Sequence, residues 1–187
     1  MKPVFVIVSG PPGAGKTTIA RRLSEELALP LITKDDIKES LFGSLGWSDR
    51  DWSKRVGAAT WDLIFLLMER LEASETSAIV ESNFYPEQQR AKLETVCGSH
   101  GVVEVHCTAD PRVLSERFNN RERHPGHNPD GAPHTVEAAA ETLHNNGPLA
   151  LGRLVEVDTT HPDKFDWDDV IGRVRKALGE TRGAEDG

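Results

Sequence analysis

Residues 4–18 read VFVIVSGPPGAGKTT, and this stretch decides the fold. It opens with an unbroken apolar run, which is typical of a buried strand in a parallel sheet. Glycines and prolines then interrupt the run, and a helical pattern begins at Lys16. A strand that passes through a glycine-rich turn into a helix is the opening of a βαβ unit. The sequence therefore predicts an α/β fold.

The turn between this strand and helix fits the pattern GxxxxGK[ST] at every fixed position. Glycines let backbone amides wrap around a phosphate chain, and the helix start presents the positive end of its dipole to the same anion. We expect the Lys16 ammonium to bind the β- and γ-phosphates and the Thr17 hydroxyl to bind Mg²⁺. The residues predicted to bind the nucleotide are Gly10, Pro11, Pro12, Gly13, Ala14, Gly15, Lys16, Thr17 and Thr18.

Strands and amphipathic helices alternate along the rest of the chain. Further strands are expected at 31–32, 77–81, 102–107 and 153–157, and helices at 37–42, 49–73, 86–100, 111–121, 135–144 and 167–178. The pattern predicts a parallel sheet covered on both faces, in a single domain over residues 1–178 with a flexible tail at 179–187. The apolar face expected for the long helix consists of Trp52, Val56, Leu63, Leu67 and Leu71.

The composition bounds the class of protein. The chain has 187 residues, 37% of them hydrophobic and 28% charged, which is typical of a globular domain. No apolar run approaches the ~18 residues of a membrane span. Cys97 and Cys107 are too few for a disulfide framework and are expected to be buried, so a reducing cytoplasm is the simplest compartment. The net charge of −8 disfavours broad binding of nucleic acid.

Acidic residues follow the second and third predicted strands, at the sheet edge where ligands of such folds bind. Asp35 or Asp36 could accept the proton of an attacking hydroxyl or bind Mg²⁺ through water, and one of the two is expected to cap the next helix. Glu81 is expected to orient the water shell of Mg²⁺, with an exposed strand-end glutamate as the alternative. Asn83 would hydrogen-bond the substrate or the Asp35 loop.

Arg117, Arg121 and Arg123 lie near the end of the helix at 111–121, before a loop rich in proline, glycine and histidine. Arg117 and Arg121 are predicted to share one helix face and to neutralise transferring phosphates. A solvated face paired with glutamates is the alternative. For the loop histidines, a polar lid is favoured over a zinc site, because their spacing is loose; they are His124, His127 and His134.

In combination, four segments resemble the P-loop kinase group that holds polynucleotide 5′-hydroxyl kinases, chloramphenicol phosphotransferase and zeta-type toxins. The segments are GPPGAGKTT (10–18), TKDDIKESLFG (33–43), IVESNFYPEQQR (79–90) and ADPRVLSERFNNR (109–121). The resemblance implies a five-stranded parallel sheet of order 2-3-1-4-5, with a lid after strand 4 at about residues 117–134.

The resemblance also implies roles for single residues. It places the general base on Asp35, a contact with substrate phosphate on Lys38, and the lid arginines on Arg117 and Arg121. The [DE]xN element of the group falls on residues 81–83, with Glu81 where aspartate is usual. Lysine also stands at position 38, where arginine is typical, so the reaction type is preserved and the acceptor stays open.

We therefore expect a Mg²⁺- and ATP-dependent phosphotransferase that acts on a hydroxyl of a small molecule, such as a sugar, a nucleoside or an antibiotic-like alcohol. In this scheme Thr17, with Glu81 acting through water, positions Mg²⁺, and Asp35 deprotonates the acceptor. Contacts to the nucleotide base are expected near residues 159–162. One alternative is a polynucleotide 5′-hydroxyl kinase, which would need a basic groove. Another is a nucleotide-binding or NTP-hydrolysing switch, which would tolerate loss of Asp35.

Overall fold

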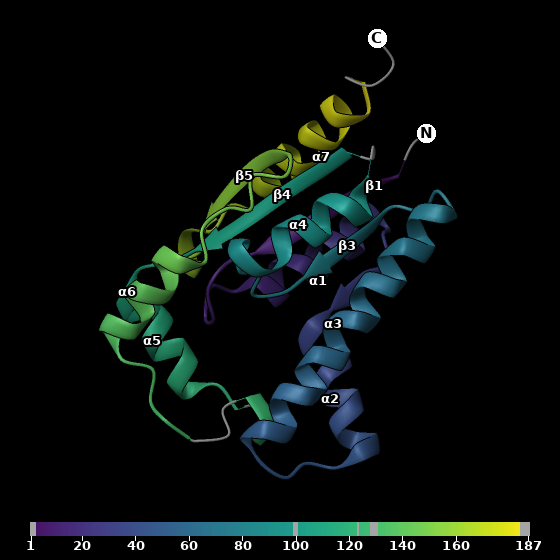
Figure 1. Cartoon of the computed structure of the whole chain (residues 1–187). Helices are drawn as coiled ribbons and strands as arrows, with labels where there is room; N and C mark the ends of the chain where they lie inside the picture. The colour runs from purple at the N-terminus through teal and green to yellow at the C-terminus, as the bar shows by residue number, and fades with distance from the viewer. Residues whose placement is uncertain (1–2, 99–100, 123, 128–130, 184–187) are drawn as a thin grey trace.

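The computed structural model describes residues 3–98, 101–122, 124–127 and 131–183. Its centre is a parallel sheet of five strands in the order β2-β3-β1-β4-β5 (Figure 1). The strands are β1 (Val4–Ser9), β2 (Leu31–Thr33), β3 (Ala78–Glu81), β4 (Gly101–Thr108) and β5 (Arg153–Asp158). The α/β fold and the strand order that the sequence implied are therefore confirmed.

Helices connect the strands and cover both faces of the sheet. They are α1 (Lys16–Leu27), α2 (Lys34–Leu45), α3 (Arg50–Ala73), α4 (Pro86–Cys97), α5 (Pro111–Asn120), α6 (Val136–Asn145) and α7 (Trp167–Gly183), with short 3₁₀ turns η1 (Pro125–His127) and η2 (Pro162–Lys164). Among the described residues, none of these helices combines the length and apolar character needed to cross a bilayer.

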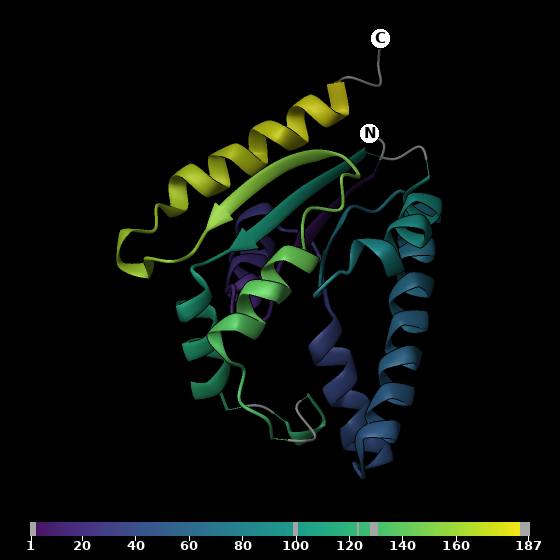
Figure 2. The ribbon, with the colours of Figure 1, turned by 60° about the vertical axis from the view of Figure 1, so that its left-hand side comes forward.

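The core has two halves because successive side chains of a strand point to opposite faces of the sheet. Val6 and Val8 of β1 pack with residues of α1 and α7, such as Leu23 and Val174. Phe5 and Ile7 pack on the other face, against residues of α3 and α4 that include Ile64, Met68 and Leu93. Figure 2 shows α7 running beside β5 and β4, with α3 across the molecule from it. The result is a three-layer sandwich.

Two arms extend beyond the carboxyl edge of the sheet and meet at their far ends (Figures 1 and 2). One arm consists of α2 and α3, and the other consists of α5, α6 and the turn η1. The arms are joined where Ser53 of α3 donates a hydrogen bond of 2.6 Å to the carbonyl oxygen of Gly126 in η1. The segment after β4 that was expected to form a lid is thus docked on the opposite arm.

Helix α2 begins earlier than residue 37, where the sequence pattern placed it. The Thr33 hydroxyl accepts a 3.2 Å hydrogen bond from the Asp36 amide, and this cap lets the helix start at Lys34. The expectation that Asp35 or Asp36 caps this helix is therefore wrong. Gly43 does not end the helix, which continues to Leu45; Gly46, with φ of 81°, ends it.

The buried face of α3 also differs from the predicted one. Leu63 and Leu67 are 38% and 43% exposed, whereas Ile64 and Met68 are fully buried. The buried residues of the helix are Ser53, Val56, Thr60, Ile64 and Met68. The pattern was misleading because two of these positions are hydroxyl residues; the Thr60 side chain bonds to the Val56 carbonyl at 2.7 Å and can be buried.

The last helix extends further than predicted, because residues 179–183 continue it. Helix α7 continues to Gly183, and the side chain of Thr181 lies against Gly101 at the start of β4. A Cβ atom at Gly101 would lie 2.0 Å from Thr181 Cγ2, so the glycine makes room for this contact. Residues 184–187 lie outside the described part of the chain.

Candidate active site

The glycine-rich loop leaves β1 at the carboxyl edge of the sheet and packs tightly on its neighbours. Gly10 has φ of 133°, and a Cβ atom there would lie 2.1 Å from the carbonyl oxygen of Cys107 in β4. Gly13 has φ of 87°, and its Cβ atom would lie 2.7 Å from the Leu114 oxygen in α5. Only glycine satisfies both the positive φ and the close approach, so the loop has a fixed path over β4 and α5.

Lys16 is the first residue of α1, and its side chain turns back across the loop. It is 6% exposed, and its Nζ atom donates a 2.8 Å hydrogen bond to the Pro11 carbonyl oxygen. Burial lowers the pKa of this ammonium, and the nearby Glu81 carboxylate opposes that shift. A cation held at low exposure beside the glycine-rich loop is suited to bind an anion.

Thr17 and Glu81 meet directly below the loop. Glu81 is the last residue of β3, pairs in register with Val8 of β1 and is 4% exposed, so it is not an exposed strand-end glutamate. The Thr17 hydroxyl donates to Glu81 Oε2 at 3.2 Å. Burial raises the pKa of Glu81, which the Lys16 charge partly offsets. A hydroxyl and a carboxylate form the sparse oxygen donor set that fits Mg²⁺ with its own water shell.

The two aspartates after β2 have different surroundings. Asp36 has a 60% exposed carboxylate that lies 3.6 Å from Arg21, and its charge raises the pKa of Glu81. The charge of Asp35 raises the pKa of both Lys16 and Glu81. The Asp35 Oδ1 atom also lies 3.6 Å from Nδ1 of His127 in the lid. Of the two carboxylates, only that of Asp35 acts on the Lys16 ammonium as well as on Glu81.

A lysine that sequence reasoning did not single out lies beside Asp35. The Lys34 ammonium is 5.2 Å from the centre of the Trp61 ring, and Trp61 in turn contacts Phe84 at a centroid distance of 5.4 Å. Burial lowers the pKa of Lys34, and the charge of Asp35 opposes this shift. The only sequence signal was its place next to Asp35. Lys34 and Trp61 therefore form a cation–π pair next to Asp35, and Phe84 supports the Trp61 ring from the core.

Two residues predicted to contact substrate lie on the same side. Asn83 is half-buried just after β3. The Lys38 ammonium donates hydrogen bonds to Ser53 Oγ at 2.9 Å and to the Gly126 carbonyl at 3.4 Å. In this structure Lys38 therefore joins α2 to α3 and the lid. Its contact with a substrate phosphate stays a prediction, as does the role of Asn83.

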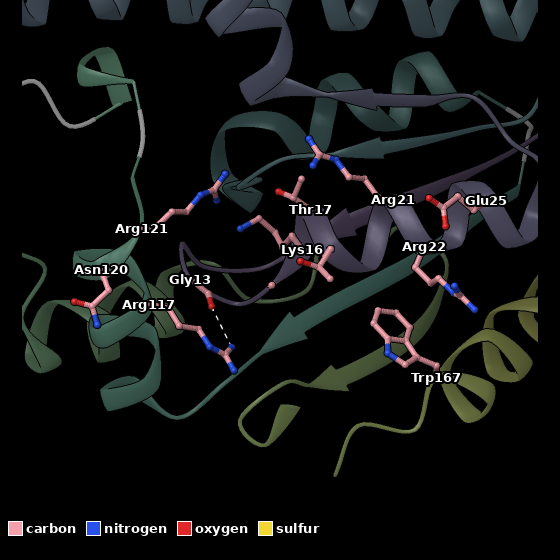
Figure 3. Close-up of a pocket in the computed structure, with 12 residues that line it drawn as sticks. Gly13, Lys16, Thr17, Arg21, Arg22, Glu25, Arg117, Asn120, Arg121 and Trp167 are labelled. Atoms are coloured by element: carbon pink, nitrogen blue, oxygen red, sulfur yellow. Dashed lines mark hydrogen bonds between the residues drawn. The ribbon is translucent and has the colours of Figure 1, made fainter. Parts of the chain in front are cut away.

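The lid arginines do not share a helix face, contrary to the sequence prediction. Helix α5 ends at Asn120, and Arg121 follows it with extended backbone angles, φ −83° and ψ 123°. In Figure 3, Arg121 points toward Lys16 and Thr17, whereas Arg117 points away from them. Both line an open pocket of about 890 Å³ over the loop. Arg123 lies outside the described residues.

Arg117 instead holds together three separate segments. Its Nη1 atom donates to the Gly13 carbonyl oxygen at 3.3 Å and to Thr159 Oγ1 at 3.0 Å, and its Nη2 atom donates to the Thr159 carbonyl at 2.7 Å. A second pocket of about 410 Å³ opens beside it, lined by residues that include Pro162, Phe165 and Trp167. This partly aromatic pocket adjoins the phosphate loop at Gly15 and includes Thr159 and Pro162, where base contacts were expected.

The lid histidines are engaged within the protein. The His124 ring stacks on Phe42 at a centroid distance of 4.8 Å, and the His134 carbonyl accepts a 2.6 Å hydrogen bond from Ser115. His127 lies between Asp35 and Glu39. Within the described ranges, no group of three or more His, Cys, Asp and Glu side chains could hold a metal ion. Cys97 and Cys107 are both buried and unbonded to each other, and burial raises the pKa of each thiol to about 12.

Comparisons with known proteins agree with this arrangement. A model of an AAA-domain family matches residues 5–144. The cytidylate kinase of Archaeoglobus fulgidus is 27% identical over 119 residues, which are 63% of this chain and 61% of that enzyme. The chain thus matches about three fifths of the length of this curated relative.

Solved structures extend the likeness over the whole fold. A candidate kinase from Chloroflexus aurantiacus is 36% identical, with a TM-score of 0.88 over 95% of this chain and 99% of that one. The shikimate kinase of Acinetobacter baumannii is 16% identical, with a TM-score of 0.64 over 96% and 94% of the two chains. The second likeness concerns the fold alone.

Proposed function

The chain belongs to the AAA-domain family and has the fold of P-loop kinases, and from this premise we propose that it transfers the γ-phosphate of ATP to a hydroxyl of a small molecule. The observation that carries the proposal is the place of Asp35. Its carboxylate lies at the sheet edge, within electrostatic reach of both Lys16 and Glu81. A base beside the phosphate-binding cation is what a kinase with an alcohol acceptor requires.

The loop side of the site would bind the nucleotide. Lys16 and the loop amides would hold the β- and γ-phosphates, as in other phosphate loops. Thr17, and Glu81 through water, would hold Mg²⁺, which when bound would neutralise charge on the phosphate oxygens. The pocket of about 410 Å³ beside Arg117, which Phe165 and Trp167 line, would accept the base.

The acceptor would bind on the other side of the loop, beside Asp35 at the start of α2. Its hydroxyl oxygen attacks the γ-phosphorus while the bond from that phosphorus to the bridging oxygen of ADP breaks. The hydroxyl proton passes to the Asp35 carboxylate. Arg121, which points toward the phosphate loop (Figure 3), would neutralise the charge that develops on the transferring group.

A small acceptor fits better than a polynucleotide. The chain carries a net charge of −8. Two of the lysines near the acceptor side have internal partners, because Lys38 bonds to Ser53 and Gly126 and Lys34 lies over Trp61. A continuous basic groove for phosphates of a nucleic acid therefore has little support.

The experiment is a transfer assay with γ-labelled ATP over a panel of sugars, nucleosides, shikimate-like alcohols, cytidine nucleotides and 5′-hydroxyl oligonucleotides. We expect one class of small alcohol to be labelled, and Asp35→Asn to keep ATP affinity while losing about 10²–10⁴-fold in transfer. Asp36→Asn is the matched control, because that carboxylate is exposed and paired with Arg21. Transfer by Asp35→Asn at the wild-type rate would exclude Asp35 as the base.

Two other results would support the alternatives. Preferential labelling of oligonucleotide 5′ ends would identify a polynucleotide kinase. Failure of every acceptor, together with nucleotide-dependent association with another protein that survives Asp35→Asn, would identify a switch.

A further inference from the structure

The lid places one histidine directly between two carboxylates of α2. Nδ1 of His127 lies 3.6 Å from Asp35 Oδ1, and Nε2 of the same ring lies 3.0 Å from Glu39 Oε1. The His127 side chain is only 11% exposed, whereas the two carboxylates are about half-exposed. Asp35 and Glu39 are one helical turn apart, so the imidazole lies along the side of α2. The lid therefore contributes a titratable group beside the proposed base.

Several contacts fix His127 in this position. The carbonyl of the preceding residue, Gly126, accepts hydrogen bonds from Ser53 at 2.6 Å and from Lys38 at 3.4 Å. Gly126 also packs on Phe42, because a Cβ atom at this glycine would lie 2.2 Å from Phe42 Cε2. The His124 ring stacks on the same phenyl ring. The backbone of Gly126 and the His124 ring therefore contribute to this docking, and the His127 ring also lies edge-on to Phe42 at a centroid distance of 6.5 Å.

The neighbours of the ring also determine which nitrogen carries the proton. An ionised carboxylate can only accept hydrogen bonds, so the 3.0 Å contact with Glu39 places the proton of a neutral imidazole on Nε2. Nδ1 then presents its lone pair to Asp35. Burial lowers the pKa of His127 below its ordinary value and the Lys38 charge lowers it further, whereas the carboxylates of Asp35 and Glu39 oppose this shift. A lowered pKa favours the neutral imidazole at pH 7.

We propose that His127 is a positioning residue for Asp35. The His127 ring accepts a hydrogen bond from the Asp35 carboxyl group once that carboxyl group has taken the proton of the phosphate acceptor. The proposal rests on the assignment of Asp35 as the base of a kinase. Before transfer, the ionised Asp35 and the Nδ1 lone pair are both acceptors, which agrees with a separation of 3.6 Å rather than a hydrogen bond. After transfer, Asp35 has an O–H donor, and the interaction becomes attractive.

The hydrogen bond between protonated Asp35 and His127 therefore favours proton transfer from the acceptor hydroxyl to Asp35 over the reverse transfer. As the oxygen–phosphorus bond forms, the acceptor proton moves to Asp35, and the new O–H can bond to Nδ1 of His127. The proton can then pass to Nδ1, which gives an imidazolium whose Nε2–H remains bound to Glu39 and whose charge is lost when a proton returns to water. Contacts of this kind tighten as the reaction proceeds, and they raise kcat because they are absent from the ground state.

The kinetic test compares three variants in the full chain, with the acceptor found by the transfer assay. We expect His127→Ala to lower kcat about 10-fold or more, a part of the 10²–10⁴-fold that general-base help supplies, with the KM for ATP unchanged. Glu39→Gln should produce a smaller loss, because it weakens the tautomer preference. His124→Ala is the control: it removes a lid histidine that stacks on Phe42 and does not face Asp35, so it should alter acceptor KM or stability and keep the wild-type pH profile.

The pH profile separates this role from simple lid docking. In the wild type, kcat should fall as the pH drops through the lowered pKa of His127, below its ordinary value of about 6.5, because the imidazolium cannot accept a proton. His127→Ala should lack that step. If His127→Ala and His124→Ala have the same kcat and the same pH profile while Asp35→Asn is inactive, the role of His127 is excluded and the proposed function stands. If Asp35→Asn is fully active, Asp35 is not the base, and the role proposed for His127 fails with that assignment while phosphoryl transfer itself stands. If no small-molecule acceptor is labelled by the wild type, the proposed function itself fails.

A second measurement needs no acceptor. Nitrogen-15 NMR of the histidine rings, with His127 assigned from its loss in His127→Ala, should show a neutral ring protonated on Nε2 at pH 7. Glu39→Gln should shift the tautomer balance toward Nδ1–H. A ring that is protonated on Nδ1 alone, or fully charged at pH 7, would overturn the proposal even before a substrate is known.

Discussion

Both terminal nitrogens of Arg117 donate hydrogen bonds to Thr159, one to the hydroxyl at 3.0 Å and one to the backbone carbonyl at 2.7 Å. This pair links the lid helix α5 to the segment after β5, and the hydrogen bond from Arg117 to Gly13 extends the link to the phosphate loop. The Thr159 hydroxyl also donates to the Ala14 carbonyl at 3.1 Å. The wall between the glycine-rich loop and the pocket beside Trp167 is therefore built from segments that are far apart in the chain.

The two lid arginines should differ in kinetic effect. We expect Arg121→Ala to lower kcat by more than it raises the KM for ATP, because its side chain points toward Lys16 and Thr17 (Figure 3). Arg117→Ala should mainly raise the KM for ATP and lower Tm, because it loses three hydrogen bonds that shape the base pocket. Steady-state kinetics over a range of ATP concentrations and a thermal melt test both. Equal losses of kcat in Arg117→Ala and Arg121→Ala, with no change in the Tm of Arg117→Ala, would contradict the different roles of the two arginines.

Lys16 should bind ATP at a cost to the stability of the free protein. Lys16→Met should abolish detectable ATP binding by calorimetry while raising Tm in the absence of nucleotide, since it removes a buried cation. Burial lowers the pKa of Lys16 in the folded state below its value of 10.5 in the unfolded chain. The unfolded state therefore binds more protons between these two pKa values, and wild-type stability should increase with pH in that window. Lys16→Met should lack this increase, and an unchanged pH dependence of Tm would contradict the argument.

Glu81 should show the opposite pH behaviour and control the metal dependence. Its pKa is raised by burial above the ordinary value of 4.5, so the folded state binds the extra proton and wild-type stability should decrease as pH rises from about 4.5 through the folded pKa. Glu81→Gln should remove that decrease and raise Tm at pH 7.

The same variant, Glu81→Gln, should need more Mg²⁺ for half-maximal transfer, and EDTA should stop transfer by the wild type. Activity that persists in EDTA would exclude the assigned metal site.

The buried face of α3 can be tested with two adjacent residues. Met68 is fully buried and Leu67 is 43% exposed. We expect Met68→Ala to lower the free energy of unfolding by about 2–5 kcal/mol and Leu67→Ala to change it by about 0.5 kcal/mol or less. Urea unfolding measures both. A larger loss for Leu67→Ala would mean that this side of the helix is covered in solution.

The local sequence determined the frame of this protein. The apolar run 4–8, the glycines of the loop and Lys16 specify a strand, a turn and a helix by contacts within a few residues, so they could be recognised without the fold. Glu81 was predictable for a related reason. A residue that ends a strand of a parallel sheet must lie at the same edge as the phosphate loop, whatever the rest of the chain does.

Tertiary structure decided which of the candidate groups meet. Arg121 faces Lys16 and Thr17 because α5 ends at Asn120, one residue before the end predicted from the sequence. Only the packed structure shows that Arg117 is hydrogen-bonded to Thr159. His127 reaches Asp35 through the docking of η1 on Phe42 and Ser53, a contact between segments that share no local pattern. The periodicity of a sequence indicates which face of its own helix or strand a residue occupies. Which residue it contacts from another segment, as His127 contacts Asp35, depends on the path of the whole chain.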